Sequence, residues 1–242
     1  MNDYLKKILQ AQVYEVAKET PLEKASNLSR RLKNNIYLKR EDLQEVFSFK
    51  IRGAYNKMRS LTNEQLNNGV ITSSAGNHAQ GVALSAQRLN CKATILMPLT
   101  TPLVKINAVR ALEAEVILYG ENYDESYIEA IRLSNERNLS FIHPFDDDEV
   151  IAGQGTIGIE LINQHGKSPD VIYIAVGGGG LIAGVSAYIK NLWPNTKIIG
   201  VEPEDANAMT QSLNENRIVS LDKVGLFADG VAVKKVVQKL LK

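Results

Sequence analysis

Hydrophobic residues along the chain recur in two patterns, short apolar runs and longer segments with helical spacing. The short runs predict β-strands at residues 36–39, 69–72, 93–97, 115–118, 171–176 and 197–201. Apolar residues three and four apart predict helices at residues 4–17, 28–32, 54–61, 78–89, 102–112, 123–138, 150–165, 181–192 and 205–214. From residue 69 onwards strands and helices alternate, which is typical of an α/β fold with right-handed crossovers and largely parallel sheets.

Three segments carry further expectations about burial. The run at residues 171–176 is almost continuously apolar, so we expect a strand that is buried on both faces. The charged residues 40–42 are expected to form a solvated turn. The acidic residues 146–149 are interpreted as a solvated loop rather than a metal site, because no further ligands are spaced to complete a cage.

Composition excludes several classes of protein. Apolar residues make up 44% and charged residues 23% of the 242-residue chain, as in ordinary soluble globular proteins. A net charge of +1 gives no electrostatic argument for a nucleic-acid or membrane partner. The single cysteine, Cys91, excludes an internal disulfide, and three dispersed histidines do not favour a zinc site. With neither a signal peptide nor a membrane-spanning run, we expect a cytoplasmic protein without a metal.

Lys50 is the first candidate for chemistry. It lies between Phe49 and Ile51 and precedes a predicted helix. An ammonium group in apolar surroundings is poorly solvated, which lowers its pKa and favours the neutral, nucleophilic amine. Such an amine can form a Schiff base with an aldehyde cofactor. The alternative is a surface lysine whose aliphatic stem lies on apolar neighbours, which is the commoner case for an isolated lysine.

A first glycine-containing turn follows the strand at residues 69–72. Residues 73–81 read Ser-Ser-Ala-Gly-Asn-His-Ala-Gln-Gly and open a helix. Backbone N–H groups and the helix dipole converge at such a position, and small side chains let a carboxylate approach closely. The alternative is an ordinary helix start that Ser74 or Asn77 caps.

A second turn, the tetraglycine turn at residues 177–180, lies between the apolar run at 171–176 and a predicted helix. Four glycines leave the backbone amides unshielded, which suits a phosphate group. The turn lacks the Lys-Ser/Thr of a Walker loop and the spacing of a dinucleotide fingerprint. The alternative is a turn that is glycine-rich because it packs closely against its neighbours. A Schiff-base lysine, a carboxylate site and a phosphate site together describe a site for pyridoxal phosphate and an amino acid.

Four motifs, in this order, resemble those of the threonine dehydratases (threonine ammonia-lyases), which belong to the tryptophan-synthase-β-like class of pyridoxal-phosphate enzymes. They lie at residues 48–54, 74–81, 151–156 and 177–181. Residues 14–17, 20–22 and 224–234 are more similar to the biosynthetic enzymes of the isoleucine pathway than to the catabolic ones. The resemblance extends from about residue 4 to about residue 234.

The resemblance implies β-elimination of water from L-threonine, which yields 2-oxobutanoate and ammonia. Lys50 would be both the cofactor lysine and the base that removes the Cα proton. The cofactor-binding residues would be Phe49 beside the pyridine ring, Asn77 at the 3′ oxygen, and Gly177, Gly178, Gly179, Gly180 and Leu181 at the phosphate. The substrate carboxylate would be received by Ser74, Ala75, Gly76, Asn77 and His78. The alternatives are a catabolic threonine or serine dehydratase, and a cofactor-binding remnant with little activity.

The resemblance also implies an architecture of two three-layer α/β/α domains with mostly parallel sheets. A small domain at residues 46–144 would be inserted into a large one formed by residues 1–45 and 145–242, with the cofactor between them. Family members form homo-oligomers, tetramers at full length. They continue past residue 242 into a segment that supplies a serine to the pyridine nitrogen, and then into a regulatory ACT-like domain. We therefore expect a truncated chain that binds cofactor weakly and is poorly soluble, with a basic tail at 235–242 that does not match the family.

Serine racemases are related to this family and differ from it at positions that can be compared. Their second acid–base serine corresponds to Ala75, whose methyl group cannot relay a proton. Of their metal-site positions, Glu202 and Ala206 match, but a carboxylate is replaced by Ala208. The resemblance thus favours elimination over racemisation and predicts no metal.

Overall fold

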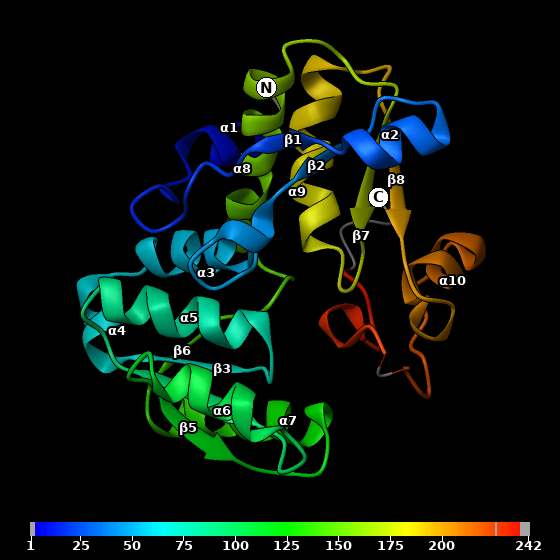
Figure 1. The fold of residues 1–242 in the computed structure, drawn as a ribbon. Helices are drawn as coiled ribbons and strands as arrows, with labels where there is room; N and C mark the ends of the chain where they lie inside the picture. Colours follow the sequence, from blue (N-terminus) through cyan, green and yellow to red (C-terminus); the bar gives the residue numbers. More distant parts are fainter. Residues whose placement is uncertain (1–2, 226, 238–242) are drawn as a thin grey trace.

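The computed structural model describes residues 3–225 and 227–237, and it has the α/β fold with parallel sheets that the sequence predicts (Figure 1). The helices are α1 (Asp3–Gln10), α2 (Ser26–Leu32), α3 (Lys50–Arg59), α4 (Asn63–Asn68), α5 (Asn77–Arg88), α6 (Leu103–Arg110), α7 (Tyr123–Glu136), α8 (Asp148–His165), α9 (Gly180–Leu192) and α10 (Ala208–Glu215). The strands are β1 (Leu22–Lys24), β2 (Tyr37–Lys39), β3 (Val70–Ser73), β4 (Ala93–Met97), β5 (Glu115–Leu118), β6 (Ser140–Phe141), β7 (Val171–Ala175) and β8 (Lys197–Val201). The described residues also contain three short 3-10 helices, η1 (Glu41–Leu43), η2 (Glu204–Ala206) and η3 (Asp229–Val231).

A parallel sheet of four strands, in the order β5-β4-β3-β6, forms the lower part of the molecule in Figure 1. Its strands bury side chains on both faces in alternation. Val70 and Ile95 pack into a cluster with residues of α3, α5 and α6. Ile71 and Leu96, one position further along each strand, pack against α7 on the opposite face. The sheet is therefore the centre of a three-layer arrangement.

The second parallel sheet pairs β7 with β8 and has only one well-covered face. Ile174 packs with residues of α8 and α9, whereas the side chain of its neighbour Tyr173 is 69% exposed. The expectation of a strand buried on both faces is therefore wrong for β7. The reason is that no helix of the described residues covers the Tyr173 side of the strand, where Val201 of β8 is also exposed.

Helix α3 lies between α5 and α8, and glycines allow the close approach on both sides. A Cβ atom on Gly81 of α5 would lie 3.2 Å from the backbone of Lys50, and one on Gly153 of α8 would lie 2.6 Å from the carbonyl oxygen of Arg52. A Cβ on Gly184 of α9 would lie 2.2 Å from the carbonyl oxygen of Ile151 in α8. The glycines of the motif at residues 151–156 thus serve helix packing.

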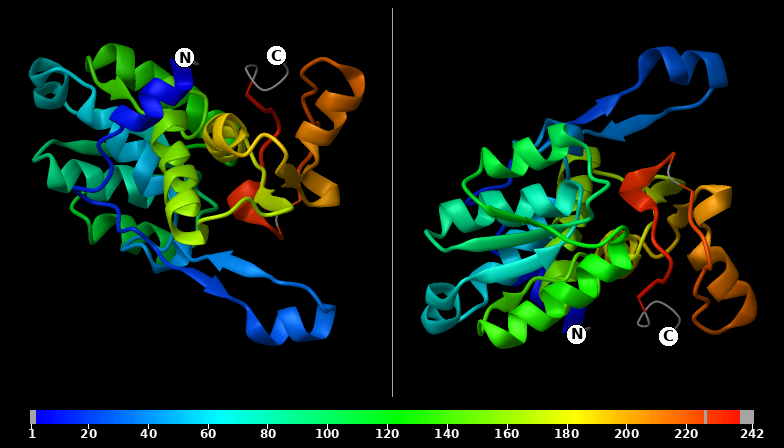
Figure 2. Two further views of the ribbon diagram at one scale, coloured as in Figure 1. Left: turned by 90° about the horizontal axis from the view of Figure 1, so that it is seen from above. Right: turned by 90° about the horizontal axis from the view of Figure 1, so that it is seen from below.

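An arm made of β1, α2 and β2 extends away from the rest of the molecule (Figure 2). Its two strands are antiparallel, with Leu22 opposite Lys39. The sequence pattern indicates the second strand and the helix, but not β1. Three residues are too few to show an alternation of apolar and polar side chains.

Several predicted boundaries are corrected by tertiary contacts. The helix expected at residues 4–17 ends at Gln10, and the amide of Gln12 donates to the Asn56 side chain, 3.0 Å away, rather than to a helical carbonyl. Helix α4 is not predicted, although Thr62 and Gln65 form a capping box at its start. Helix 205–214 is split into η2 and α10.

The acidic residues 146–149 form a loop only in part, which corrects their interpretation: Asp146 and Asp147 precede α8, whereas Asp148 and Glu149 belong to its first turn. Asp147 caps α8, because its carboxylate accepts hydrogen bonds from the amides of Glu149 and Val150, and the helix begins at Asp148. Asp147 also pairs with Lys57 of α3 at 2.8 Å. Glu149 pairs with Lys7 of α1 at 2.7 Å. Negative charges at a helix N-terminus also interact favourably with the helix dipole.

The described part of the C-terminal region lies across the tetraglycine turn. The amide of Val237 donates to the carbonyl of Gly178 at 2.9 Å, and Lys234 pairs with Asp124 of α7 at 2.6 Å. Residue 226 of the family-like segment and residues 238–242 of the predicted basic tail lie outside the described residues. No helix of the described residues is long and apolar enough to cross a membrane.

Candidate functional site

Lys50 is the first residue of α3, rather than preceding the helix as the sequence suggests. Its amine donates a hydrogen bond to the carbonyl oxygen of Pro144 at 3.1 Å and lies 5.5 Å from the centre of the Phe49 ring. No ion pair to Lys50 is found among the described residues. Burial lowers the pKa of the Lys50 amine to about 8, because the charged form loses its solvation. The interpretation of Lys50 as a surface lysine is therefore wrong.

The first glycine-containing turn ends at Gly76, and Asn77 is the first residue of α5. The hydroxyl of Ser74 accepts a hydrogen bond from the Gly76 amide at 3.3 Å, but no side chain caps the helix. A Cβ atom on Gly76 would meet no other atom within 4 Å. Ser74, Ala75 and Gly76 are half-buried, and Asn77 is exposed. The alternative of a helix start capped by Ser74 or Asn77 is therefore not what the structure shows.

The tetraglycine turn packs tightly, and it also leaves the start of α9 without a side-chain cap. A Cβ atom on Gly178 would lie 2.3 Å from the Phe145 ring, and one on Gly180 would lie 2.8 Å from the Phe145 carbonyl oxygen. Gly179 has a φ of 99°, a conformation that side chains other than glycine rarely adopt. Both interpretations of the turn thus have support: close packing explains its glycines, and the uncapped helix start suits an anion.

Some helix starts in the described residues have a side-chain cap, whereas α5 and α9, like α2, α3, α6 and α10, have none. Thr62, Asn122 and Asp147 each accept hydrogen bonds from the first-turn amides of α4, α7 and α8. The amides at the starts of α5 and α9 have no such partner, and each follows a glycine directly after a parallel strand. Uncapped helix starts carry partial positive charge, which favours carboxylate and phosphate groups.

A short segment, Ile142 to Phe145, connects the three candidate features. The carbonyl oxygen of Ile142 lies 3.0 Å from Nε2 of His78, and the carbonyl oxygen of Pro144 accepts from Lys50. Phe145 then packs on Gly178. We call residues 142–145 the connecting segment. The sequence analysis did not identify the connecting segment as part of the site. The signal for it in the sequence is weak, because only its position after β6 distinguishes it.

His78 has a defined protonation state in this arrangement. Because the Ile142 carbonyl can only accept, Nε2 of His78 must carry the proton, and Nδ1 is a bare acceptor. Nδ1 is buried and has no partner in the described residues. Burial, together with the nearby positive charge of Lys50, lowers the pKa of His78 to about 3, so the ring is neutral. The ring thus has no free N–H for a carboxylate, and only the backbone amide of His78 could donate one.

Phe49 and Leu181 lie on the side of the site where the second sheet begins. Phe49 directly precedes α3, and Leu181 is in the first turn of α9. Both are half-buried and pack against the same apolar cluster, which includes Val185 and Ile174. The ring of Phe49, 5.5 Å from the Lys50 amine, and Leu181, next to the tetraglycine turn, thus pack against one apolar cluster.

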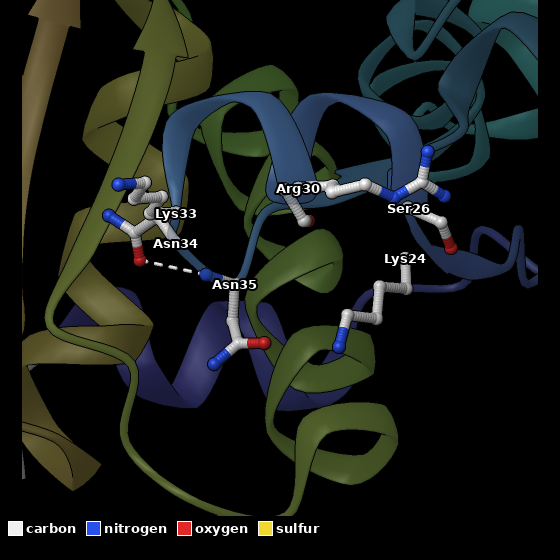
Figure 3. A pocket seen from close by; sticks show the side chains of 7 residues that line it. Lys24, Ser26, Arg30, Lys33, Asn34 and Asn35 are labelled. Carbon is white, nitrogen blue, oxygen red and sulfur yellow. Dashed lines mark hydrogen bonds between the residues drawn. The ribbon is translucent and has the colours of Figure 1, made fainter.

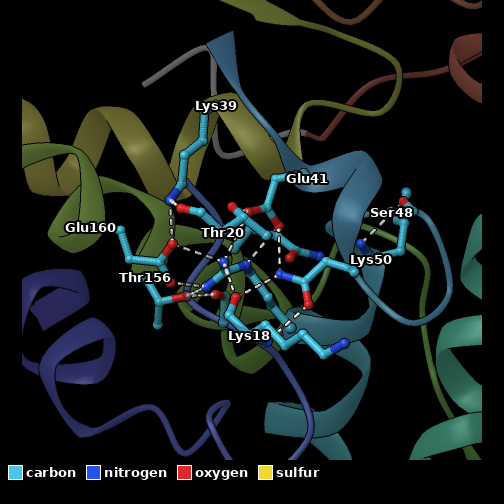
Figure 4. A network of polar contacts seen from close by, with 12 residues as sticks. Lys18, Thr20, Lys39, Glu41, Ser48, Lys50, Thr156 and Glu160 are labelled. Carbon is cyan, nitrogen blue, oxygen red and sulfur yellow. Dashed lines mark hydrogen bonds and ion pairs between the residues drawn. The ribbon is translucent and has the colours of Figure 1, made fainter. Parts of the chain in front are cut away.

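Arg52, two residues after Lys50, is fully buried within a polar network that the sequence does not reveal. Figure 4 shows this network, with Lys39, Glu41 and Glu160 among its labelled residues. Its guanidinium group pairs with Glu41 at 2.8 Å and with Glu160 at 2.5 Å. Lys39 pairs with Glu160 as well, at 2.5 Å. Burial opposes the charge of Arg52, but the two carboxylates raise the pKa of its guanidinium group overall. The expectation of a solvated turn at residues 40–42 is thus wrong for Glu41.

A separate cavity of about 480 Å³ lies on the arm, remote from these features (Figure 3). It is lined by Lys24, Ser26, Ser29, Arg30, Lys33, Asn34 and Asn35. None of the sequence-predicted site residues contributes to it. Among the described residues, no group of three or more histidine, cysteine, aspartate or glutamate side chains is placed to hold a metal ion. Glu202 instead accepts hydrogen bonds from the amides of Met209 and Thr210 in α10.

The residues present fit pyridoxal phosphate. The group needs a lysine amine of lowered pKa, a flat apolar side chain near it, and an anion site for its phosphate. Lys50, Phe49 and the uncapped start of α9 meet these requirements. The connecting segment contacts both Lys50 and the tetraglycine turn, so the amine and the anion site belong to one region.

Comparisons with known proteins agree with this geometry. The family model described as pyridoxal-phosphate dependent enzyme matches residues 13–242. The chain is 58% identical over 238 residues to biosynthetic L-threonine dehydratase of Burkholderia multivorans, covering 97% of this chain and 47% of that protein. It is also 58% identical to chloroplastic biosynthetic threonine dehydratase 1 of Solanum lycopersicum, covering 97% of this chain and 39% of that protein. The chain thus spans less than half the length of these relatives.

Solved structures are similar over nearly the whole chain. The processed form of threonine deaminase isoform 2 from Solanum lycopersicum superposes with a TM-score of 0.96 at 57% identity, covering 98% of this chain and 65% of that one. Maize serine racemase superposes with a TM-score of 0.92 at 31% identity, covering 96% of this chain and 70% of that one.

Proposed function

The chain belongs to the family of pyridoxal-phosphate-dependent enzymes, and from this premise we propose that it is the cofactor-binding core of a threonine dehydratase of the biosynthetic type. The reaction is the deamination of L-threonine to 2-oxobutanoate and ammonia. The proposal is supported by 58% identity to biosynthetic threonine dehydratases over 97% of the chain. The structural observation that carries it is the hydrogen bond from Lys50 to the connecting segment, which brings a poorly solvated amine beside the two uncapped helix starts.

In this proposal Lys50 has two roles that follow from its neutral amine. It would hold the cofactor covalently through the cofactor's aldehyde, and as a free amine it would accept the proton from Cα. The ring of Phe49 would support the cofactor, and Asn77 would donate to its ring oxygen. Gly177 to Gly180 and Leu181 would hold the phosphate at the start of α9. Pyridoxal phosphate, when bound, supplies the electron sink that makes the Cα proton removable.

The turn at residues 74–78 orients the substrate. We propose that the backbone amides at the start of α5 receive the carboxylate of threonine, with Ser74, Ala75, Gly76, Asn77 and His78 around it. His78 takes part through its backbone amide, because its ring nitrogen Nδ1 is a bare acceptor. Binding the carboxylate at this helix start and the amino group at the cofactor would fix the Cα proton relative to Lys50.

We further propose the domain division, assembly and location that go with this function. Residues 46–144 form the small domain around the four-stranded sheet, and residues 1–45 and 145–242 form the large one. The protein forms a homo-oligomer. A cytoplasmic location is supported by the bacterial relative, although the tomato and Arabidopsis relatives are chloroplastic.

The experiment is to purify the chain, add pyridoxal phosphate and L-threonine, and measure 2-oxobutanoate per mole of bound cofactor. Reduction with borohydride should fix the cofactor on Lys50, and Lys50→Ala should lose both the label and the product. Lys6→Ala on the exposed side of α1 is the matched control and should keep both. A label on another lysine, or unchanged product in Lys50→Ala, would refute the assignment. Cofactor binding without product would favour a remnant instead.

A further inference from the structure

Arg52 is buried and charged, yet it contacts neither of the proposed anion sites. Its guanidinium group reaches Glu41 of η1, Glu160 and Thr156 of α8, and the backbone carbonyl of Lys18, all within 3.1 Å. Lys39 completes the network through Glu160. Two cations, Arg52 and Lys39, face two carboxylates, so the network is electrically balanced. Buried charges with fully satisfied partners have few alternative arrangements, and such a network specifies one geometry.

The network contacts the face of α3 that is opposite to the Lys50 side chain. Residues two positions apart on a helix are separated by about 200° and do not share a face. Their partners confirm this: Lys50 bonds to Pro144, whereas Arg52 bonds to η1 and α8. Figure 4 shows Lys50 on one side of the network and Thr156 and Glu160 on the other. Any rotation of the first turn of α3 would therefore move both side chains at once.

Apart from Arg52, the first turn of α3 is held by close packing against α5 and α8 and by a hydrogen bond from the Gly53 amide to the Gln154 side chain at 3.1 Å. Phe49 precedes the helix without a side-chain cap, and the Ser48 hydroxyl accepts only a long hydrogen bond of 3.3 Å from the Lys50 amide. Within the part of the chain that the structure describes, the Lys50 amine has one hydrogen bond, to the Pro144 carbonyl. The charged and titratable groups near it, His78 of α5 and His143 of the connecting segment, are bases that do not attract an ammonium. Among the described residues, the ion pairs of this helix turn thus come from Arg52.

We propose that Arg52 is a positioning residue: its buried ion pairs with Glu41 and Glu160 hold the first turn of α3 in the rotation that directs the Lys50 amine at the connecting segment. The importance of this for catalysis rests on the proposed function, in which Lys50 binds the cofactor. The positioning itself is a property of the protein without cofactor. Arg52 acts through the helix backbone that joins it to Lys50, and its side chain contacts η1 and α8 rather than the connecting segment.

Three variants separate positioning from stability. Arg52→Met leaves two buried carboxylates against one cation, so it is expected to lower the melting temperature. Combining Arg52→Met with Glu41→Gln leaves Lys39 paired with Glu160, which restores the charge balance and should recover most of the melting temperature. Arg52→Lys keeps the charge and loses the forked geometry of the guanidinium group. Arg59→Met is the matched control, because Arg59 lies on the same helix and its pairing with Glu15 is exposed.

The first readout is the environment of the Lys50 amine in the protein without cofactor. Trace acetylation with acetic anhydride across a pH series, quantified by mass spectrometry, gives the midpoint at which Lys50 becomes reactive. Wild type and Arg59→Met should show a midpoint near pH 8. In the balanced double variant the acetylation midpoint of Lys50 should move upward towards the usual lysine pKa of 10.5, because the amine is no longer held in its buried position. Arg52→Lys should lie between them.

The second readout is the rate at which pyridoxal phosphate becomes reducibly attached to Lys50. We expect a loss on the order of ten- to a hundredfold in the double variant, because small misplacements of a reacting group have effects of this size. A stable double variant with a wild-type acetylation midpoint would overturn the proposal and leave Arg52 a purely stabilising role. If Lys50→Ala still captured the cofactor, the proposed function would fail, while the acetylation midpoint would still test the positioning.

Discussion

At the scale of single residues, the site depends on Lys50 being surrounded by groups that do not stabilise its charge. Its amine bonds to a carbonyl oxygen, and the nearest titratable side chains are His78 and His143. Burial lowers the pKa of His143 as it does that of His78. A carboxylate in the same place would hold the lysine protonated and unreactive. The reactivity of the Lys50 amine thus depends on the lack of a carboxylate partner among the described residues as much as on the lysine itself.

The lowered pKa of Lys50 predicts the pH dependence of cofactor attachment. Only the neutral amine attacks an aldehyde, so the attachment rate should rise with pH and level off above about 8. An ordinary lysine would still gain reactivity up to its usual pKa of 10.5. Stopped-flow absorbance with pyridoxal phosphate between pH 6 and 11 measures the profile. A rate that continued to climb beyond pH 9.5 would show that the Lys50 amine is solvated.

Ala75 predicts that elimination is not accompanied by racemisation. It lies half-buried in the turn before α5, and its methyl group cannot carry a proton to the face opposite Lys50. We expect no appreciable D-serine or D-threonine from the L-amino acids, and we expect Ala75→Ser to add detectable D-serine. Chiral chromatography of the products checks both. D-serine formed by the unchanged protein as fast as keto acid would contradict the assignment.

At the scale of elements, the candidate site depends on how α5 and α9 begin and on how closely α3 packs against its neighbours. Helices α5 and α9 begin without side-chain caps at glycine turns, whereas α4, α7 and α8 begin with them. Helix α3 is held between α5 and α8 by contacts that leave no room for a side chain at Gly153 and little room at Gly81. The two proposed anion sites and the lysine are therefore carried by closely packed elements.

The crossing of α8 and α9 predicts a large effect from one added methyl group. In Gly184→Ala the new Cβ would lie 2.2 Å from the Ile151 carbonyl oxygen and 2.7 Å from the Gly155 amide nitrogen, both of which are backbone atoms. We expect a loss of stability at the upper end of about 1–3 kcal/mol. Urea unfolding followed by circular dichroism measures it. Ser186→Ala on the same helix is the control, with an expected change within about 0.5 kcal/mol. Equal stabilities for the two variants would show that the helices can separate freely.

At the scale of the whole molecule, the two parallel sheets differ in how they are covered. Helices lie on both faces of the four-stranded sheet, but one face of the β7–β8 pair exposes Tyr173, Ile199 and Val201. The described C-terminal residues run from this sheet to the other part of the molecule, where Lys105 of α6 pairs with Asp229 and Asp124 of α7 pairs with Lys234. Such exposed ion pairs add little stability individually.

The exposed face of β7 and β8 predicts concentration-dependent association. Adjacent apolar side chains on one sheet face form the kind of patch that promotes association. We expect Tyr173→Lys combined with Val201→Lys to reduce association, with little change in the melting temperature. Sedimentation velocity over a concentration series measures it. Ile128→Lys is the control, because Ile128 is equally exposed but lies on α7. If this control reduced association as much, general charge rather than the sheet face would be responsible.

The sequence by itself determined most of the order of strands and helices, without β1, α4 and β6, and it determined the two glycine turns and the candidate lysine. The apolar runs of β3 and β4, and the glycines before α5 and α9, are local patterns that hold wherever the segment lies. The sequence also carries the resemblance that the family match later confirmed. Boundaries such as the end of α1 were wrong because the Gln12 amide is taken by Asn56, which is 44 residues away along the chain.

Only the tertiary structure decided which residues surround Lys50 and what holds them there. The contact of Arg52 with Glu160 joins residues that are 108 positions apart along the chain. Nothing in the local sequence of Arg52, Glu41 and Glu160 distinguishes them from solvated charges. The same is true of the connecting segment, whose Ile142 and Pro144 carbonyls meet His78 and Lys50 only after the chain has folded. Periodicity reports the burial of one segment at a time, whereas pairing of buried charges depends on where distant segments are brought together.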